Sequence, residues 1–202
     1  MGICYLVGAG DFFGQINVGE NDIVIAADGG YDNLVRHGYT PDILVGDFDS
    51  IVGDAPEGIC KIKYPVKKDE TDMFLAYKTG VEVGYTDFVM LGATGGRLDH
   101  TYANLSLLLY AKEHGHNVTA INDGGVIFCI KNETVSLEGD EGATFSVFAI
   151  DGKAQGVTIK DAEYETSDTE LDPSFPLGIS NKFKAVPASI SVKDGALLVI
   201  AE

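Results

Sequence analysis

Ile43-Leu44-Val45-Gly46-Asp47-Phe48-Asp49-Ser50 is a short apolar run that ends in two aspartates separated by one residue. A run of this length, bounded by glycine and aspartate, predicts a buried strand of a parallel sheet. Alternate side chains of an extended chain point the same way, so both carboxylates converge at the carboxyl end of that strand, where α/β proteins bind ligands. Two like charges held together are normally neutralised by a cation. The stretch therefore predicts a Mg²⁺ site and phosphate chemistry.

Apolar runs alternate with helical patterns on both sides of this stretch. This alternation predicts a Rossmann-like α/β/α domain with a mostly parallel sheet over residues 1–122. The expected strands are Gly2–Gly8, Ile23–Asp28, Ile43–Asp47, Phe88–Gly92 and Asn117–Asn122. The expected helices are Tyr31–His37, one with Met73, Phe74, Tyr77 and Val81 at helical spacing, and one with Leu98, Tyr102, Leu105 and Leu109 that ends near Gly115.

Residues 123–202 follow a different pattern. Asp123-Gly124-Gly125 is a strong turn signal, and short apolar runs separated by Glu-Gly-Asp and Asp-Gly turns follow it without a helical period. Short strands at this spacing predict a small C-terminal β-sandwich or open barrel. The expected strands are Val126–Ile130, Thr134–Leu137, Thr144–Ile150, Val157–Ile159, Ala185–Val192 and Ala196–Ala201.

Composition excludes several classes of function. A formal charge of −17 opposes nucleic-acid binding, which needs Lys and Arg at the phosphates, but it suits cation binding. No apolar stretch reaches 18 residues and no basic signal-peptide region is present, so we expect neither a membrane span nor secretion. Cys4, Cys60 and Cys129 are odd in number and lack CxxC spacing, which favours a reducing compartment. We therefore expect a cytoplasmic protein.

Further carboxylates recur where predicted strands end or helices begin. Asp28 precedes Gly29-Gly30, Asp69 and Asp72 stand at the start of a helix, and Asp99 follows a glycine-rich turn. Taken alone, Asp69 is more typical of a helix N-cap, and Asp-Gly-Gly is more typical of a turn. In a parallel sheet, however, these turns lie on one edge, so together they indicate a carboxylate-lined site. The sequence leaves open which carboxylate binds metal and which acts as a base.

The turn Gly92-Ala93-Thr94-Gly95-Gly96 has backbone amides that can hold phosphate, and Arg97 adds a fork of donors. Lys67 and Lys68 are equally well explained as solvated loop lysines and as phosphate ligands. His100 has no second His or Cys at ligand spacing, which favours a hydrogen-bonding role over zinc. The chain has no P-loop and no G-x-S-x-G elbow. Gly8–Gly14 is too weak a match to support a dinucleotide site.

Five motifs, in order, resemble the thiamine pyrophosphokinase family over residues 25–200. They are Ala27-Asp28-Gly29-Gly30, Gly46-Asp47-Phe48-Asp49-Ser50, Lys68-Asp69-Glu70-Thr71-Asp72, Gly95-Gly96-Arg97-Leu98-Asp99-His100 and Gly178-Ile179-Ser180-Asn181. The resemblance implies transfer of a pyrophosphoryl group from ATP to the hydroxyl of thiamine, giving thiamine diphosphate and AMP. It also implies a homodimer in which the α/β domain of one subunit faces the β-domain of the other across each active site.

The resemblance assigns roles that agree with the chemistry of these residues. Asp47, Asp49 and Asp72 are expected to hold Mg²⁺, and Asp28 to bind metal or orient the attacking hydroxyl. The expected ATP-binding residues are Asp28, Gly29, Gly30, Asp49, Gly92, Thr94, Gly95, Gly96, Arg97, Asp99 and His100. The expected thiamine-binding residues are Lys68, Ser180 and Asn181.

The chain departs from the family in one respect: it has no Trp, which some members set against the thiamine ring. Phe183 and Tyr164 are the candidates to replace that aromatic face. Two other functions remain open at this point. One is a metal-dependent phosphohydrolase with Asp47 as nucleophile and Asp49 as acid, although the usual D-x-D-x-T is incomplete. The other is a nucleotide- or thiamine-binding regulatory module.

Overall fold

The computed structural model describes residues 2–48, 58–65, 67 and 69–202. These residues form two compact units, each with its own hydrophobic core. The first unit comprises Met1–Leu107 and Gly115–Asn122, and the second comprises Leu108–His114 and Asp123–Glu202. No helix within the described ranges is long and apolar enough to cross a membrane.

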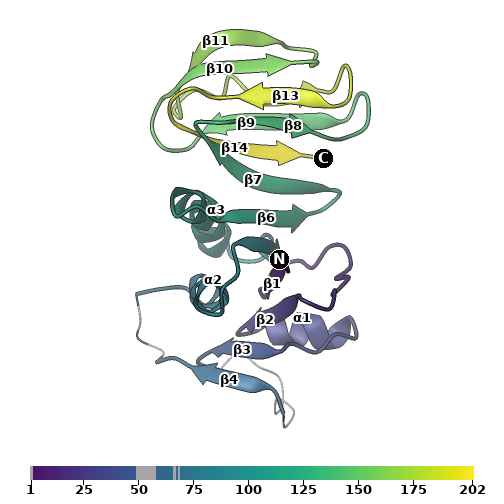
Figure 1. Cartoon of the computed structure of the whole chain (residues 1–202), viewed down its shortest axis with the longest axis vertical. Coiled ribbons are helices and arrows are strands. Elements are labelled where there is room, and N and C mark those ends of the chain that lie inside the picture. Colours follow the sequence, from purple (N-terminus) through teal and green to yellow (C-terminus); the bar gives the residue numbers. More distant parts are fainter. Residues whose placement is uncertain (1, 49–57, 66, 68) are drawn as a thin grey trace. The chain divides into compact units, whose positions relative to one another are not determined.

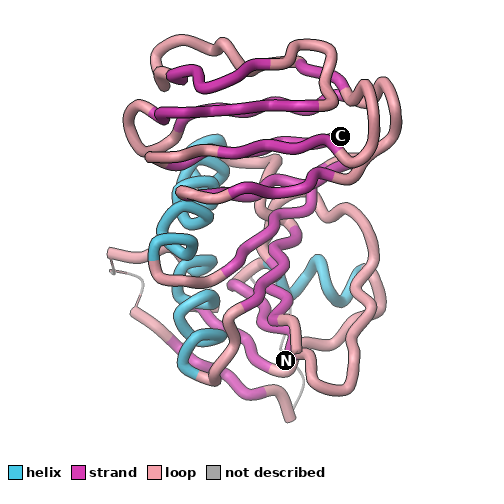
Figure 2. Tube along the Cα trace, turned by 45° about the horizontal axis from the view of Figure 1, so that its top comes forward, coloured by secondary structure: helices cyan, strands magenta, loops and turns pink. Residues whose placement is uncertain are grey.

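The first unit is built on a parallel sheet with helices on both faces (Figures 1 and 2). Across the sheet the strands are β6 (Asn117–Asn122), β5 (Asp87–Leu91), β1 (Cys4–Val7), β2 (Ile23–Ala27), β3 (Ile43–Gly46) and β4 (Cys60–Lys63). The helices are α1 (Gly30–Arg36), α2 (Asp72–Glu82) and α3 (Leu98–Glu113), whose last turn belongs to the second unit. The predicted mostly parallel α/β sheet is confirmed at this level.

Buried apolar strands hold the first unit together. β1 and β3 are buried at every position, and Val7 and Leu44 share one core with Leu34 of α1 and Leu91 of β5. Full burial of an aliphatic side chain stabilises a fold by roughly 1.5–3 kcal/mol, so these short runs are the main source of cohesion in the sheet. They also bring the carboxyl ends of neighbouring strands to one edge.

Two details of the first unit differ from the sequence expectation. β4 was not predicted, because its sequence Cys-Lys-Ile-Lys is that of a mostly exposed edge strand. The third helix is present, but its predicted apolar face is wrong at its first turn. Leu98 and Tyr102 are 82% and 72% exposed, whereas Leu107, Leu108 and Ala111 are buried.

The second unit is antiparallel throughout its described pairings. One set of paired strands runs β12 (Asn181–Lys182), β9 (Thr144–Ala149), β14 (Ala196–Ala201) and β7 (Gly125–Lys131). The other runs β11 (Thr166–Leu171), β10 (Ala154–Lys160), β13 (Ala188–Ser191) and β8 (Thr134–Leu137). β11 was missed because it is mostly polar, and β13 is shorter than predicted because Pro187 has no N–H to donate to a ladder.

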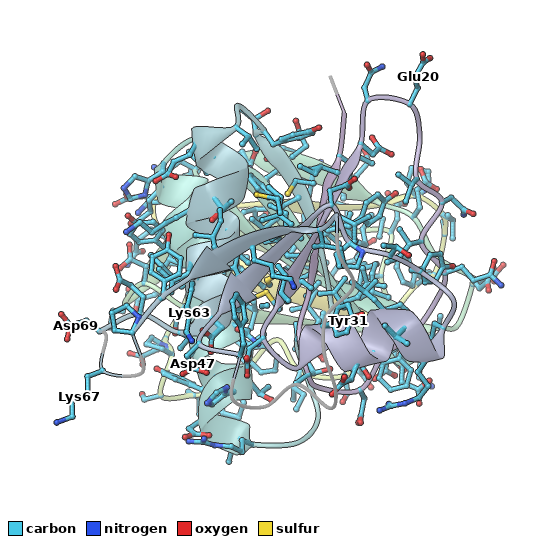
Figure 3. The ribbon with its side chains drawn as sticks, turned by 90° about the horizontal axis from the view of Figure 1, so that it is seen from below. Glu20, Tyr31, Asp47, Lys63, Lys67 and Asp69 are labelled. Carbon is cyan, nitrogen blue, oxygen red and sulfur yellow. The ribbon has the colours of Figure 1, made fainter. Side chains whose placement is uncertain are left out.

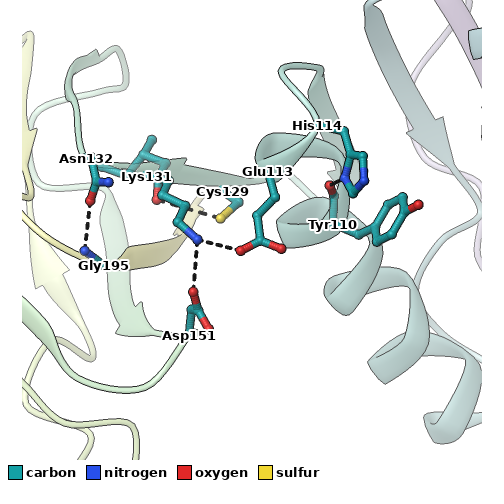
Figure 4. Close-up of polar contacts among 9 residues, drawn as sticks. Tyr110, Glu113, His114, Cys129, Lys131, Asn132, Asp151 and Gly195 are labelled. Carbon is teal, nitrogen blue, oxygen red and sulfur yellow. Dashed lines mark hydrogen bonds and ion pairs between the residues drawn. The ribbon is translucent and has the colours of Figure 1, made fainter.

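Ion pairs join the last turn of α3 to the strands of the second unit (Figure 4). Lys131 on β7 pairs with Glu113 and with Asp151, whose carboxylate lies 3.0 Å from its Nζ. Hydrogen bonds to these carboxylates raise the pKa of Lys131. Lys112 similarly pairs with Glu133 at 2.7 Å. Exposed pairs contribute about 0–1 kcal/mol each, so this cluster orients the helix end more than it stabilises the fold.

Candidate functional site

A cavity of about 360 Å³ lies in the first unit, beyond the carboxyl ends of β1, β2 and β5. Its lining combines carboxylates, glycine-rich turns and one guanidinium. The structure brings these predicted residues together there: Asp28, Gly29, Asp72, Gly92, Gly95, Gly96, Arg97 and His100. Gly30, Asp47, Thr94 and Asp99 are described but lie outside the lining, and Asp49 and Lys68 lie outside the described residues.

The backbone around Asp28 holds its carboxylate closely. Asp28 is 9% exposed, and its backbone adopts φ +44°, a left-handed conformation that is uncommon for residues other than glycine. Its Oδ1 accepts a hydrogen bond from the Phe48 amide at 3.2 Å. A Cβ on Gly46 would approach the Asp28 Cβ to 3.0 Å, so the end of β3 passes directly against it. This packing places the carboxylate beside the turn that carries Asp47.

Asp47 is half-buried at the end of β3, and Figure 3 shows it beside Lys63. The register of β3 with β4 pairs Lys63 with Gly46, so Lys63 lies on the neighbouring strand, opposite the residue that precedes Asp47. Sequence reasoning missed Lys63 because β4 was not foreseen. Among the described residues, no three His, Cys, Asp or Glu side chains converge as a metal site, and Asp49 is not among them.

The start of α2 contributes a second carboxylate to the cavity. Thr71 is the N-cap, and its Oγ1 accepts a hydrogen bond from the Phe74 amide at 3.2 Å. Asp72 follows as the first helical residue, where the helix dipole favours a negative charge. Lys67 and Asp69 behave differently, because both are exposed and project outward in Figure 3. Of the carboxylates around this helix start, only Asp72 lines the cavity.

Gly30 and Gly92 shape the cavity wall by letting backbones approach closely. A Cβ on Gly30 would lie 1.9 Å from the Val7 carbonyl oxygen, so this glycine lets α1 begin against the end of β1. A Cβ on Gly92 would lie 2.3 Å from the Gly8 carbonyl oxygen. Thr94 is held behind the wall, with its Oγ1 donating to Asn122 Oδ1 at 2.8 Å. Gly30 and Thr94 therefore support the cavity from behind its surface, whereas Gly92 lines it.

Arg97 and Asp99 form a two-point ion pair at the start of α3. Arg97 Nη2 and Nε lie 2.6 and 3.1 Å from the two Asp99 carboxylate oxygens, and His100 donates its amide to the same group at 3.0 Å. The Arg97 guanidinium holds the pKa of the Asp99 carboxyl below its usual range. Both side chains are largely exposed, at 72% and 63%. The pair costs little to open, so the guanidinium remains accessible to an anionic ligand.

A second cavity, of about 200 Å³, lies within the second unit. Asn181 and Tyr164 line it, together with Glu165 and apolar side chains from β10, β11 and the segment before β12. Asn181 is 4% exposed; its Oδ1 accepts the Tyr164 amide at 3.0 Å and its Nδ2 donates to the Tyr164 carbonyl at 2.9 Å. Ser180 precedes Asn181 with φ +56°, is exposed, and is not part of the lining.

The structure distinguishes the two aromatic candidates. Phe183 is 2% exposed and packs against Phe145 with ring centroids 4.9 Å apart, so it belongs to the core. Tyr164 is 65% exposed and lines the second cavity. Of the two candidates, only Tyr164 lines this cavity.

Sequence reasoning missed several residues of the first cavity. Gly8–Gly10 line it, although the sequence of this stretch is only a weak match to a dinucleotide motif. Asn104 lines it as well, and its Nδ2 donates to the Ala93 carbonyl at 2.7 Å. The sequence held no signal for Asn104, because it lies off the face of Leu98, Tyr102, Leu105 and Leu109 that was predicted to be buried. The glycine density after the first strand was the signal for Gly8–Gly10.

The fold and the two cavities define a class: an α/β protein with a polar ligand site at the carboxyl ends of parallel strands, followed by an antiparallel unit with its own apolar pocket. Residues 17–120 match the family model for the thiamin pyrophosphokinase catalytic domain, and residues 132–197 match that for the thiamin pyrophosphokinase vitamin B1 binding domain. The chain therefore belongs to the thiamin pyrophosphokinase family.

Individual relatives agree with this assignment. The chain is 26% identical over 187 residues to a thiamine pyrophosphokinase of Bacillus subtilis. This alignment covers 90% of the chain and 87% of the relative. The solved structure of a B. subtilis thiamine pyrophosphokinase has a TM-score of 0.88 at 23% identity, covering 100% of this chain and 99% of that one. That of Geobacillus thermodenitrificans has a TM-score of 0.85 at 25% identity, with coverage of 99% and 97%.

Proposed function

We propose that this protein transfers the pyrophosphoryl group of ATP to the hydroxyl of thiamine, producing thiamine diphosphate and AMP. The observation that carries the proposal is the meeting of Asp28, Asp72, the glycine turn Gly92–Gly96 and Arg97 around one cavity. Carboxylates for a cation and amides and a guanidinium for phosphate are what a nucleotide triphosphate requires. Family membership and the names of the relatives support thiamine as the acceptor.

ATP binds in the first cavity in this proposal. Turn amides and the start of α3 hold its phosphates, and Arg97 turns from Asp99 to a phosphate oxygen. Asp99 and His100 keep the guanidinium within reach of the cavity in the absence of the nucleotide. The residues assigned to ATP are Asp28, Gly29, Gly30, Asp49, Gly92, Thr94, Gly95, Gly96, Arg97, Asp99 and His100.

Mg²⁺ accompanies ATP in this proposal, held by Asp47, Asp49 and Asp72. The donor set fits, because carboxylate oxygens are the ligands that Mg²⁺ prefers and Asp72 already lines the cavity. When bound, the cation neutralises charge on the phosphates. The proposed Mg²⁺ site needs Asp49 as well as Asp47 and Asp72, because the described residues alone do not bring three such ligands together.

Asp28 orients the acceptor in the proposed reaction. The thiamine hydroxyl oxygen forms a bond to the β-phosphorus as the bond from that phosphorus to the oxygen bridging the α-phosphorus breaks, so AMP leaves and the hydroxyl proton is released. Asp28 is the carboxylate whose position is fixed by the strand end and by the Phe48 amide. Positioning and electrostatics suffice for phosphoryl transfer, and no covalent nucleophile is required.

Thiamine binds in the second cavity in this proposal. A flat organic cation is favoured by an aromatic face and a nearby carboxylate, which Tyr164 and Glu165 supply. Asn181 is the buried polar group that fixes the Tyr164 backbone. We retain Lys68 and Ser180 as thiamine-binding residues on the basis of the family resemblance.

The two cavities meet in a homodimer, in which the first unit of one subunit faces the second unit of its partner. Phe175, Leu177 and Ile179 support this proposal, because one segment exposes all three at 64%, 56% and 53%. Mixing Asp28→Asn with Tyr164→Ala subunits tests it. Random exchange places one intact site in half of the dimers and restores about a quarter of the wild-type rate. No recovery after demonstrated exchange contradicts a shared site.

The decisive experiment supplies Mg²⁺, ATP and thiamine and identifies the nucleotide product. AMP together with thiamine diphosphate supports the proposal, and ADP contradicts it. Phosphate release without an acceptor favours the phosphohydrolase, and binding without turnover favours the regulatory module. Asp28→Asn should abolish turnover with the fold intact. Asp87→Asn is the matched control, because Asp87 is a hydrogen-bonded carboxylate at the amino end of β5, outside the cavity lining.

The proposal also covers the domain architecture of the protein and its location in the cell. We propose that the first unit is a Rossmann-like domain over residues 1–122 and that residues 123–202 form a β-sandwich used for thiamine binding and dimerisation. The three free cysteines support a cytoplasmic location.

A further inference from the structure

A buried asparagine holds the backbone segment that follows β1. Asn33 lies on α1 and is 6% exposed. Its Nδ2 donates hydrogen bonds to the carbonyl oxygens of Gly8 and Gly10, each 2.8 Å away. Two carbonyl acceptors require two N–H donors, and a single side-chain amide supplies both. Arg36 Nη1 lies 3.2 Å from Asn33 Oδ1 and fixes the remaining end of the amide.

The same segment is tied on its other side to the turn after β5. The amides of Gly8, Gly10 and Asp11 donate to carbonyl oxygens of that turn and of the end of β5 at 2.8, 3.0 and 2.8 Å. Ala9 is different: it is exposed, it lines the cavity, and none of the described residues accepts a hydrogen bond from its amide. The segment is therefore held from two sides with one amide left for a ligand.

We propose that Asn33 is a positioning residue for the nucleotide: it fixes Gly8–Gly10 so that the Ala9 amide donates to a phosphate oxygen of ATP. The identity of this ligand rests on the function proposed above. Backbone amides held in a fixed glycine-rich turn bind anions well because no ordering remains to be done when the anion arrives. Asn33 does not line the cavity, so its effect passes through the segment that it holds.

Two substitutions of Asn33 test the proposal. Asn33→Asp replaces the donor nitrogen of the side-chain amide with an oxygen that faces two carbonyl oxygens. Asn33→Leu removes both hydrogen bonds at similar side-chain volume. Each should weaken MgATP binding, measured by calorimetry, by about tenfold or more. The KM for thiamine should stay within about twofold of wild type, because the segment does not line the second cavity, to which thiamine is assigned.

Thr79→Val is the matched control for a loss of stability alone. Thr79 lies on α2, is 2% exposed, and donates its hydroxyl hydrogen to the Leu75 carbonyl at 2.9 Å, away from the cavity lining. It should lower Tm and leave the affinity for ATP unchanged. The proposal is overturned if the Asn33 variants lower Tm but keep the wild-type affinity for ATP. It is also overturned if they weaken the binding of ATP and of thiamine to the same extent.

A measurement on the wild-type protein covers the case in which the Asn33 variants do not fold. Hydrogen exchange in the peptide spanning Gly8–Asp11 should slow when MgATP is added, and unchanged exchange at saturating MgATP overturns the proposal. The calorimetric and hydrogen-exchange readouts use ATP binding and need no turnover. A wild-type protein that binds ATP but makes no AMP from thiamine would therefore refute the proposed reaction while the role of Asn33 is still decided.

Discussion

Gly92 offers a direct test of whether the two loops of the first cavity form one rigid wall. An alanine at this position places its Cβ 2.3 Å from the Gly8 carbonyl oxygen, about 0.7 Å inside the 3.0 Å below which such contacts are not found. The neighbour is backbone, held by Asn33 and by the end of β5, so it cannot swing aside as a side chain would. Relief requires the loops after β1 and β5 to separate.

Gly96 supplies the matched reference for this change. Both glycines have φ +62°, but a Cβ on Gly96 meets nothing within 4 Å. Each alanine costs about 1–2 kcal/mol for the left-handed backbone alone. Gly92→Ala adds overpacking, which costs typically about 1–3 kcal/mol. Urea denaturation should therefore show Gly92→Ala to be less stable than Gly96→Ala by that second amount.

Binding provides the functional half of the test. Separating the loops displaces Gly8–Gly10 and Gly92 in the cavity wall, so Gly92→Ala should also bind MgATP more weakly. Gly38→Ala is the binding control, because Gly38 has φ +80°, open space around its Cβ position, and no place in the cavity lining. If Gly92→Ala matched Gly96→Ala in stability and Gly38→Ala in affinity, the rigid-wall argument would be refuted.

Three further predictions concern pH, thiol chemistry and one ion pair. Hydrogen bonds from two backbone amides, each 2.7 Å away, lower the pKa of Asp22 in the folded protein. The ionised carboxylate therefore stabilises the fold fully above the unfolded pKa of 3.8, and this contribution is lost as the pH falls through the lower folded pKa. The Tm difference between wild type and Asp22→Asn should accordingly shrink from pH 7 to pH 3. A thiol reagent at pH 8 should modify exposed Cys60 alone, because burial raises the pKa of Cys4 and Cys129 to about 12. Rapid reaction of all three thiols without denaturant would contradict this selectivity. Arg97→Gln should leave Tm unchanged, because its ion pair is exposed, and should raise the KM for ATP about tenfold; a KM equal to wild type would remove its phosphate role.

The inner strands β1, β2 and β3 of the parallel sheet were predictable because they are short, apolar and buried. The runs at residues 43–46 and 23–27 have no competing helical period, so the pattern has one interpretation. β4 and β11 were not predictable in this way, since an exposed edge strand needs no apolar side chains. Periodicity also failed for the start of α3, where Leu98 and Tyr102 occupy exposed positions.

Site residues were found from sequence where chemistry is carried by side chains at strand ends or helix starts. Asp28 follows β2, Asp72 begins α2 and Arg97 precedes α3, and all three line one cavity. Asn33 and Asn104 were missed because they act on the backbone of distant loops, across sequence separations of 25 and 11 residues. Such bonds depend on the tertiary contact of a helix with a loop, which no local pattern specifies.

The backbone after β2 and after β3 adopts strained conformations beside the first cavity. Asp28 and Phe48 both have positive φ, +44° and +68°, although neither is a glycine. Conformations of this kind cost about 1–3 kcal/mol each and persist only where the surroundings determine them. Here the Phe48 amide bonds the Asp28 carboxylate, and Gly46, which has no side chain, lets the two strand ends touch. A chain optimised for stability alone would place glycine or asparagine at these turns. Asp and Phe retain the strain, and that strain holds the Asp28 carboxylate at the wall of the cavity, so the cost is best explained by a function of the carboxylate.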